Sequence, residues 1–158
     1  MKSMQELLAV ANSVRTDITH AATGNGEVAE RLVVVSDGAI AVPYADGIQT
    51  YRNGGVIAFI NDSGIPFAEQ AEQFVELASS MNPQAVLLGG SALTGNLGSG
   101  LRRVLAVQLF AARPRIRQAW FADITDARGL IISVSPWREA KAGPPIWAEQ
   151  ILSRADRE

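Results

Sequence analysis

The 158-residue chain contains no cysteine and only one histidine. The absence of cysteine excludes disulfides, thiolate metal sites and a cysteine nucleophile. The single histidine, His20, falls near the end of an expected helix, where an imidazolium complements the helix dipole. A catalytic role would require a partner that the order of the residues does not supply. We therefore expect no catalytic residue, no metal site and no cofactor.

The chain also lacks long apolar runs and a strong net charge. No run approaches the ~18 residues that a membrane-spanning helix needs, and the N-terminus lacks the apolar region of a signal peptide. The net charge of −2 provides no overall attraction to nucleic acid. With 47% apolar and 19% charged residues, the composition is that of a globular domain. We expect a cytoplasmic protein that binds neither membranes nor nucleic acids.

Hydrophobic periodicity and turn residues predict a single α+β domain with a mixed, mainly antiparallel sheet and helices packed on it. The expected element order is α-β-β-β-α-β-α-β-β-α. Helices are expected at residues 3–22, 66–81, 97–112 and 145–154. Strands are expected at residues 32–35, 39–42, 56–60, 85–88, 116–124 and 130–134. The first two strands should form a hairpin, and residues 45–55 should form a loop that exposes Tyr51.

The apolar stripes of these elements predict the hydrophobic core. Its expected members are Val33, Val35, Ile57, Phe59, Phe74, Leu87, Leu101, Leu105, Leu109, Phe121 and Ile132.

A glycine-rich stretch between residues 89 and 100 is the first candidate site. Read as a loop that leads into a helix, it would offer backbone N–H groups and a helix N-terminus to an anion, with two arginines one turn further on. The candidate ligands are Gly95, Asn96, Gly98, Ser99, Gly100, Arg102 and Arg103. GNLGSG resembles the pyrophosphate loop of acyl-CoA acetyltransferases, although Gly95 stands where that family has Gln or Arg. The alternative is a flexible strand-to-helix connection with Asn96 as the helix cap.

An arginine and tryptophan cluster is the second candidate site. Arg113, Arg115 and Arg117 alternate through a proline-containing turn, and Trp137 with Arg138 follows the last expected hairpin. If the two strands of that hairpin pair around residues 126–129, Arg117 and Val134 lie close together. Arginine and tryptophan are common anchors of protein interfaces. The sequence therefore predicts a partner-binding surface here, for another protein or for a second copy of the chain.

Two segments resemble the SseB family, the enhanced-serine-sensitivity proteins. In the C-terminal domain of that family, a helix is followed by a proline-containing turn, a basic residue and a strand that begins near an Ala-aromatic pair. The matching residues here are Leu109, Phe110, Pro114, Ile116, Arg117, Ala119, Trp120 and Phe121, followed by residues 130–134. GGVIAFIND at residues 54–62 resembles part of the N-terminal domain. The resemblance covers about a third of the chain and implies a non-enzymatic α/β protein without an active site.

These observations favour a non-enzymatic binding or adaptor protein that acts through the arginine and tryptophan surface. The alternative is a small enzyme or ligand-binding domain that holds a phosphate-bearing ligand, a nucleotide or an acyl-CoA, at residues 95–103.

Overall fold

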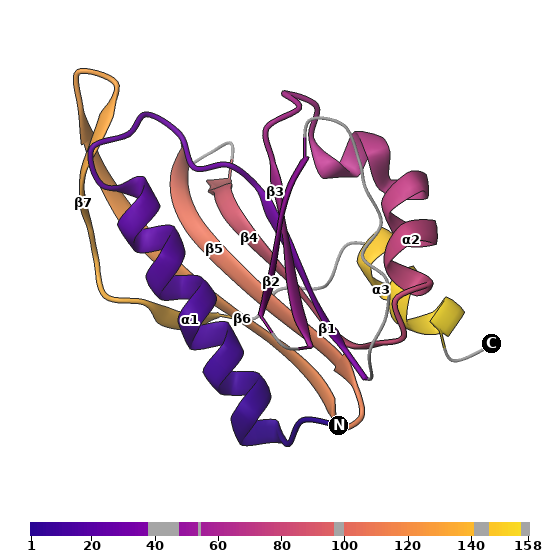
Figure 1. The fold of residues 1–158 in the computed structure, drawn as a ribbon. Coiled ribbons are helices and arrows are strands. Elements are labelled where there is room, and N and C mark those ends of the chain that lie inside the picture. Colours follow the sequence, from indigo (N-terminus) through magenta and orange to yellow (C-terminus); the bar gives the residue numbers. More distant parts are fainter. Residues whose placement is uncertain (38–47, 54, 97–99, 141–145, 156–158) are drawn as a thin grey trace.

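The computed structural model describes residues 1–37, 48–53, 55–96, 100–140 and 146–155 (Figure 1). Its helices are α1 (Met4–Ala22), the 3₁₀ helix η1 (Phe67–Gln70), α2 (Ala71–Ser79) and α3 (Ile146–Ala155). Its strands are β1 (Arg31–Ser36), β2 (Ile48–Asn53), β3 (Val56–Asn61), β4 (Pro83–Asn96), β5 (Gly100–Ala112), β6 (Arg115–Ala127), β7 (Leu130–Val134) and β8 (Arg138–Ala140).

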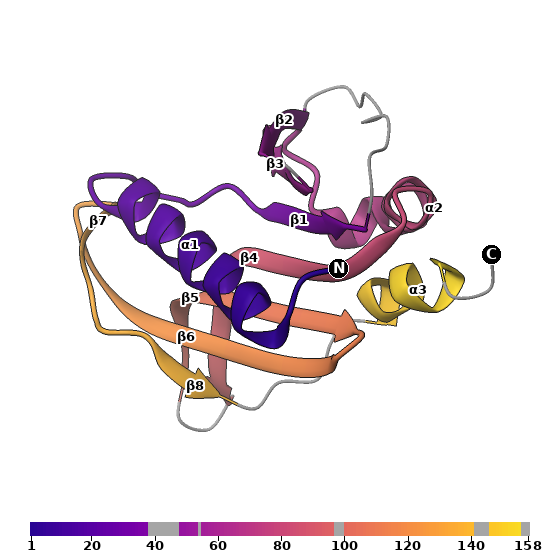
Figure 2. The same ribbon diagram turned by 60° about the horizontal axis from the view of Figure 1, so that its bottom comes forward.

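The strands form one antiparallel sheet in the order β2-β3-β1-β4-β5-β6-β7, and β8 pairs with β6 beside β7. Helices and an antiparallel sheet in one unit confirm the predicted α+β class. The long strands β4 and β5 curl strongly along their length (Figure 2). Their register, Ala85 opposite Ala111 through to Asn96 opposite Gly100, makes this hairpin the centre of the sheet.

Helix α1 covers one face of the sheet. Ser3 accepts a hydrogen bond from the Glu6 N–H at 3.2 Å, and the Glu6 carboxylate accepts one from the Ser3 N–H at 3.1 Å, which completes the predicted capping box. The helix lies across β4, β5 and β6 (Figures 1 and 2). Its buried stripe consists of Leu7, Ala11, Val14, Ile18 and Ala22. The odd-numbered residues of β5, including Leu105 and Leu109, face this stripe from the sheet.

Helices α2 and α3 cover part of the opposite face. Phe67 and Phe74 meet edge-on with ring centroids 4.6 Å apart, and both are fully buried. Ile151 of α3 and Phe110 of β5 join the same cluster. The sheet is therefore buried on both faces in its central strands, where both odd-numbered and even-numbered residues of β1, β4 and β5 are apolar.

The predicted helix at residues 97–112 is wrong, because residues 100–112 form strand β5. Leu101, Leu105 and Leu109 recur every fourth residue. This spacing satisfies a helix, but it also satisfies one face of a strand, whose period is two. Since the other face of β5 is apolar as well, the alternation that marks a half-exposed strand is absent. The helix that the family resemblance places before Pro114 is a strand for the same reason.

Three smaller expectations also need correction. Part of the expected loop at residues 45–55 is strand β2, although Tyr51 is exposed as predicted. The glycine-rich loop begins later than expected, because β4 continues to Asn96. Ile132 is 56% exposed and not in the core, because the buried residue of β7 is its neighbour Ile131. The expected second strand of the first hairpin, at residues 39–42, lies outside the described residues. The side chain of Leu101 is not described either.

Candidate functional site

The expected anion site lacks its structural basis. Arg102 and Arg103 belong to a strand, so no helix N-terminus faces a ligand here. Their side chains alternate between the two faces of the sheet. Arg102 lies 3.3 Å from the carboxylate of Asp123, whereas Arg103 donates to the Gly26 carbonyl at 2.9 Å. The remaining candidates, Gly95, Asn96 and Gly100, lie on the paired ends of β4 and β5, and Gly98 and Ser99 lie outside the described residues.

The arginine and tryptophan cluster is divided between the start and the middle of β6. The hairpin around residues 126–129 is present, but it pairs Val134 with Ile124, so the expected closeness of Val134 and Arg117 is wrong. Arg138 lies opposite Phe121, six residues along β6 from Arg115, a span of roughly 20 Å. Arg113 and Arg115 are exposed at the far end of the strand. The five residues therefore do not form one surface.

The arginines of this cluster that lie along the sheet are engaged within the fold. Arg117 forms a bidentate ion pair with Glu149 of α3, with 2.9 Å between Nη2 and Oε2, and its Nη1 donates to the carbonyls of Ala111 and Ile116. Arg138 donates to the Asp123 carboxylate at 2.8 Å. Such bonds to charged groups fix α3 and β8 on the sheet.

Trp137 packs against the core and does not form an exposed anchor. Its indole N–H donates to the Thr19 hydroxyl of α1 at 2.9 Å, and its ring contacts the cluster beneath α1. Beside it, the guanidinium of Arg15 stacks over Trp120, 4.3 Å from the ring centroid. Both tryptophans therefore bind the second half of α1 to the sheet.

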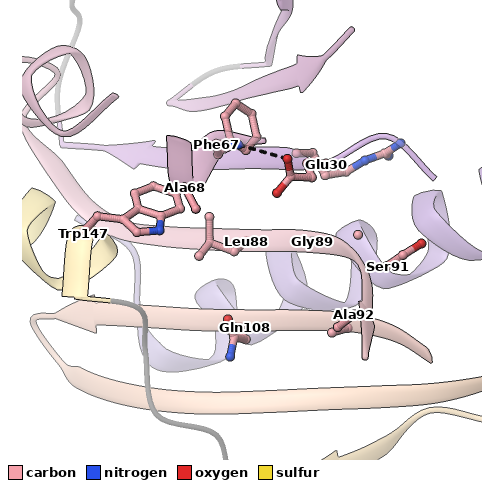
Figure 3. A pocket seen from close by; sticks show the side chains of 12 residues that line it. Glu30, Phe67, Ala68, Leu88, Gly89, Ser91, Ala92, Gln108 and Trp147 are labelled. Carbon is pink, nitrogen blue, oxygen red and sulfur yellow. Dashed lines mark hydrogen bonds between the residues drawn. The ribbon is translucent and has the colours of Figure 1, made fainter. Parts of the chain in front are cut away.

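A small pocket opens on the sheet face that carries α2 and α3 (Figure 3). It holds about 210 Å³ between η1, Trp147 of α3 and the bent part of β4 at Gly89 and Gly90. Glu30 lies at its edge and accepts a hydrogen bond from the Phe67 N–H at 3.0 Å, which caps η1. Glu30 therefore stabilises the start of η1, and the rest of the pocket lining is mainly apolar residues and glycine.

A larger groove lies on the opposite face, between α1 and strands β2 and β3. It holds about 550 Å³. Its floor and walls are mainly apolar and come from Val10, Ser13, Val14, Asp17, Arg31, Val33, Tyr51, Val56, Ala58 and Ile60. We call this depression the α1–β3 groove. The odd-numbered residues of β1 and their partners on β3 share this face, since Val35 pairs with Val56 and Val33 with Ala58.

The groove exists because α1 is displaced towards one side of the sheet. The helix packs on β4 and β5, and no described helix lies over this face of β2 and β3. Val56, Ala58 and Ile60 are consequently only half-buried, and Tyr51 is 56% exposed. Half-exposed apolar side chains that gather in one depression are typical of a contact surface.

Arg31 and Asp17 are the charged residues in the lining of this apolar groove, and Arg31 is the half-buried one. Its Nε is buried and has no hydrogen-bond partner in the described part of the chain. No carboxylate of the described residues lies within ion-pair distance of its guanidinium. Burial lowers the pKa of Arg31, an effect that the charges of Asp17 and Tyr51 oppose. A half-buried cation without an ion pair among the described residues costs stability, and the nearby charge of Asp17 offsets only part of that cost.

Sequence reasoning missed both depressions because neither follows from a motif. Arg31 lies outside the expected strand at residues 32–35, at the end of a possible helical turn over residues 27–31, and the residues of β2 fall in the expected loop. The alternation of Val56, Ala58 and Ile60 is visible in the sequence, but only the position of α1 shows that their face is uncovered.

Comparison with protein-family models, curated proteins and solved structures finds no match to this chain. None of the helices in the described ranges has the length and apolar character needed to cross a membrane. Among the described side chains, no cluster of three or more histidines and carboxylates could hold a metal ion.

Proposed function

We propose that this chain is a non-enzymatic binding protein that docks a segment of another protein in the α1–β3 groove. The observation that carries the proposal is the uncovered apolar face of β3 beside α1, which contains the half-buried cation Arg31. This surface replaces the arginine and tryptophan cluster as the proposed site. The absence of cysteine agrees with a cytoplasmic location, which belongs to the same proposal.

Kinship with the SseB family fits this proposal, because the resemblance implies a non-enzymatic protein. Of the two segments that carry it, residues 54–62 contain β3, and residues 101–134 contain most of β5 and the β6–β7 hairpin, with a strand in place of the family's helix. The proposed relationship now depends on these two segments alone.

Site-specific photo-crosslinking in cells tests the groove directly. A photoreactive phenylalanine derivative replaces Tyr51 in the groove, and a matched control carries it at Gln73, an exposed residue of α2 on the other face. We expect a crosslinked product of defined mass from position 51 and not from position 73. Adding Ala58→Arg, which places a charge on the groove floor, should remove that product while the thermal melt still shows a folded protein.

Equal crosslinking from both positions, or none above background from position 51, would overturn the proposal. A product of twice the mass of the chain would identify a second copy as the occupant.

A further inference from the structure

The α1–β3 groove lies beside α1 on the same face of the sheet. α1 packs on β4 and β5, whereas the floor of the groove is made by the odd-numbered residues of β1 and their partners on β3. A helix with its side chains is about 10 Å across, and helices pack on sheets at about that distance. A helix laid beside α1 would cover Val56, Ala58 and Ile60 and complete the layer.

The α1 helix of a second copy does not fit this position. The stripe that it could present is its outward face, and apart from Met4 and Ala9 that face is polar: its exposed residues include Gln5, Glu6, Asn12, Thr16, Asp17 and His20. If these polar side chains packed on the apolar floor of the groove, they would lose water without gaining hydrogen-bond partners, which is unfavourable. The occupant therefore needs an apolar stripe that α1 does not have on its free side.

The charged residues of the groove also determine which charge the bound segment should carry. Arg31 lies at the boundary of the groove with a guanidinium that forms no ion pair in the described part of the chain, and Asp17 of α1 faces the same groove. A carboxylate of the occupant that reaches Arg31 would compensate the half-buried cation and form charge-assisted hydrogen bonds. Asp17, an exposed residue whose charge already acts on Arg31, would repel the same carboxylate.

We infer that the α1–β3 groove binds an amphipathic helix of another protein, whose apolar stripe carries one acidic residue directed at Arg31. This inference rests on the proposed function of the groove and adds the conformation and the charge of the bound segment. Binding of a helix by its apolar stripe to a groove is a common form of peptide recognition.

Selection from a phage-displayed library of random 16-residue peptides on the immobilised full chain tests the inference. The selected peptides are synthesised, and their affinities are measured by fluorescence polarisation for the wild type and four variants. Arg31→Gln and Asp17→Asn alter the charges of the groove, and Tyr51→Glu alters its exposed wall. Arg128→Gln, in the exposed β6–β7 turn, is the control.

We expect peptides with apolar residues at helical spacing and one acidic position, which gain helical circular dichroism on binding. Arg31→Gln should weaken their binding about tenfold or more, as expected for a lost charge-assisted pair. Asp17→Asn should strengthen it, Tyr51→Glu should abolish it and Arg128→Gln should leave it unchanged. The opposite signs of the two groove charges distinguish this mechanism from a general loss of fold.

The experiment distinguishes a failure of the helix inference from a failure of the proposed function of the groove. If Tyr51→Glu abolishes peptide binding but Arg31→Gln leaves it unchanged, the predicted contact between an acidic residue and Arg31 is overturned. The groove then remains the binding site. Peptides that bind in an extended form would also overturn the helix and leave the groove. Selected peptides that no groove variant affects, or a selection that yields none, would overturn the proposed function as well.

Discussion

Ile18 of α1 packs directly on the backbone of Gly89 in β4, and the space between them cannot hold a Cβ atom. Ile18 is fully buried, so the packed neighbours of its side chain oppose any movement away from Gly89. The absence of a side chain at residue 89 thus sets how closely α1 approaches the sheet. Because Val14 and Arg31 also lie against this point, Gly89 fixes the wall of the α1–β3 groove.

Gly89→Ala should therefore destabilise the protein by ~1–3 kcal/mol, the usual cost of overpacking a filled core. The free energy of unfolding from urea denaturation measures the effect. Ile18→Val, which removes the obstructing methyl group, provides the control. In that background Gly89→Ala should cost clearly less, and a double-mutant cycle without coupling between the two residues would contradict the assigned contact.

Two arginines on the sheet are expected to respond in opposite ways to the same substitution. Arg31→Met keeps the apolar stem but removes a half-buried cation that has no ion pair among the described residues, so stability should be unchanged or higher. Arg117→Met removes the bonds to Glu149 and to two carbonyls and should cost ~1–3 kcal/mol. Thermal melts of the two variants, measured side by side, test the pair. A large loss of stability for Arg31→Met would show that Arg31 serves the fold.

The sequence predicted the elements whose local signals are unambiguous. The capping box of Ser3 and Glu6 located α1, and the turn before Leu130 located the β6–β7 hairpin. It misread β5 because a spacing of four residues satisfies both a helix and a strand face, and tertiary pairing with β4 and β6 decides between them. The first candidate site depended on that error, since the predicted anion site requires a helix N-terminus at the point where β5 begins.

The second candidate site failed for a different reason. Residue types predicted an interface from arginine and tryptophan, but the pairing register determines which of them meet. The turn between Ala127 and Leu130 places Val134 opposite Ile124, seven residues from Arg117, and Trp137 bonds to Thr19 of α1. No sequence motif indicates the α1–β3 groove. The groove exists because α1 packs over β4 and β5 and leaves the same face of β2 and β3 uncovered among the described residues.

Trp137 is expected to contribute to stability. Trp137→Ala removes a partly buried ring and the bond to Thr19 and should cost ~1–3 kcal/mol, below the value for a fully buried tryptophan. Trp137→Phe keeps most of the packing and should cost ~0.5–1.5 kcal/mol, the range of a single hydrogen bond. Ile132→Ser, on the exposed side of β7, is the control and should change the free energy of unfolding by less than ~0.5 kcal/mol. If urea denaturation gives Trp137→Ala a free energy of unfolding as close to the wild type as that of the control, this assignment is contradicted.

The last prediction concerns Asp123, which joins β5, β6 and β8 through Arg102 and Arg138. The hydrogen bond from Arg138, together with the charge of Arg102, holds the pKa of Asp123 below its ordinary value. A carboxyl whose pKa is lower in the folded state contributes stability above its unfolded pKa, and this contribution is lost as the pH falls through the folded pKa.

Asp123→Asn should therefore lower stability at neutral pH, and the difference from the wild type should vanish in the acid range. Since the group is exposed, added salt should reduce the difference at neutral pH. Unfolding curves recorded from neutral to acid pH measure the first effect. In parallel, an NMR titration of Arg138→Gln should show the Asp123 pKa rising towards its ordinary value. An unchanged pKa in that variant would mean that Arg138 does not hold the carboxylate, and the loss of stability would then require another cause.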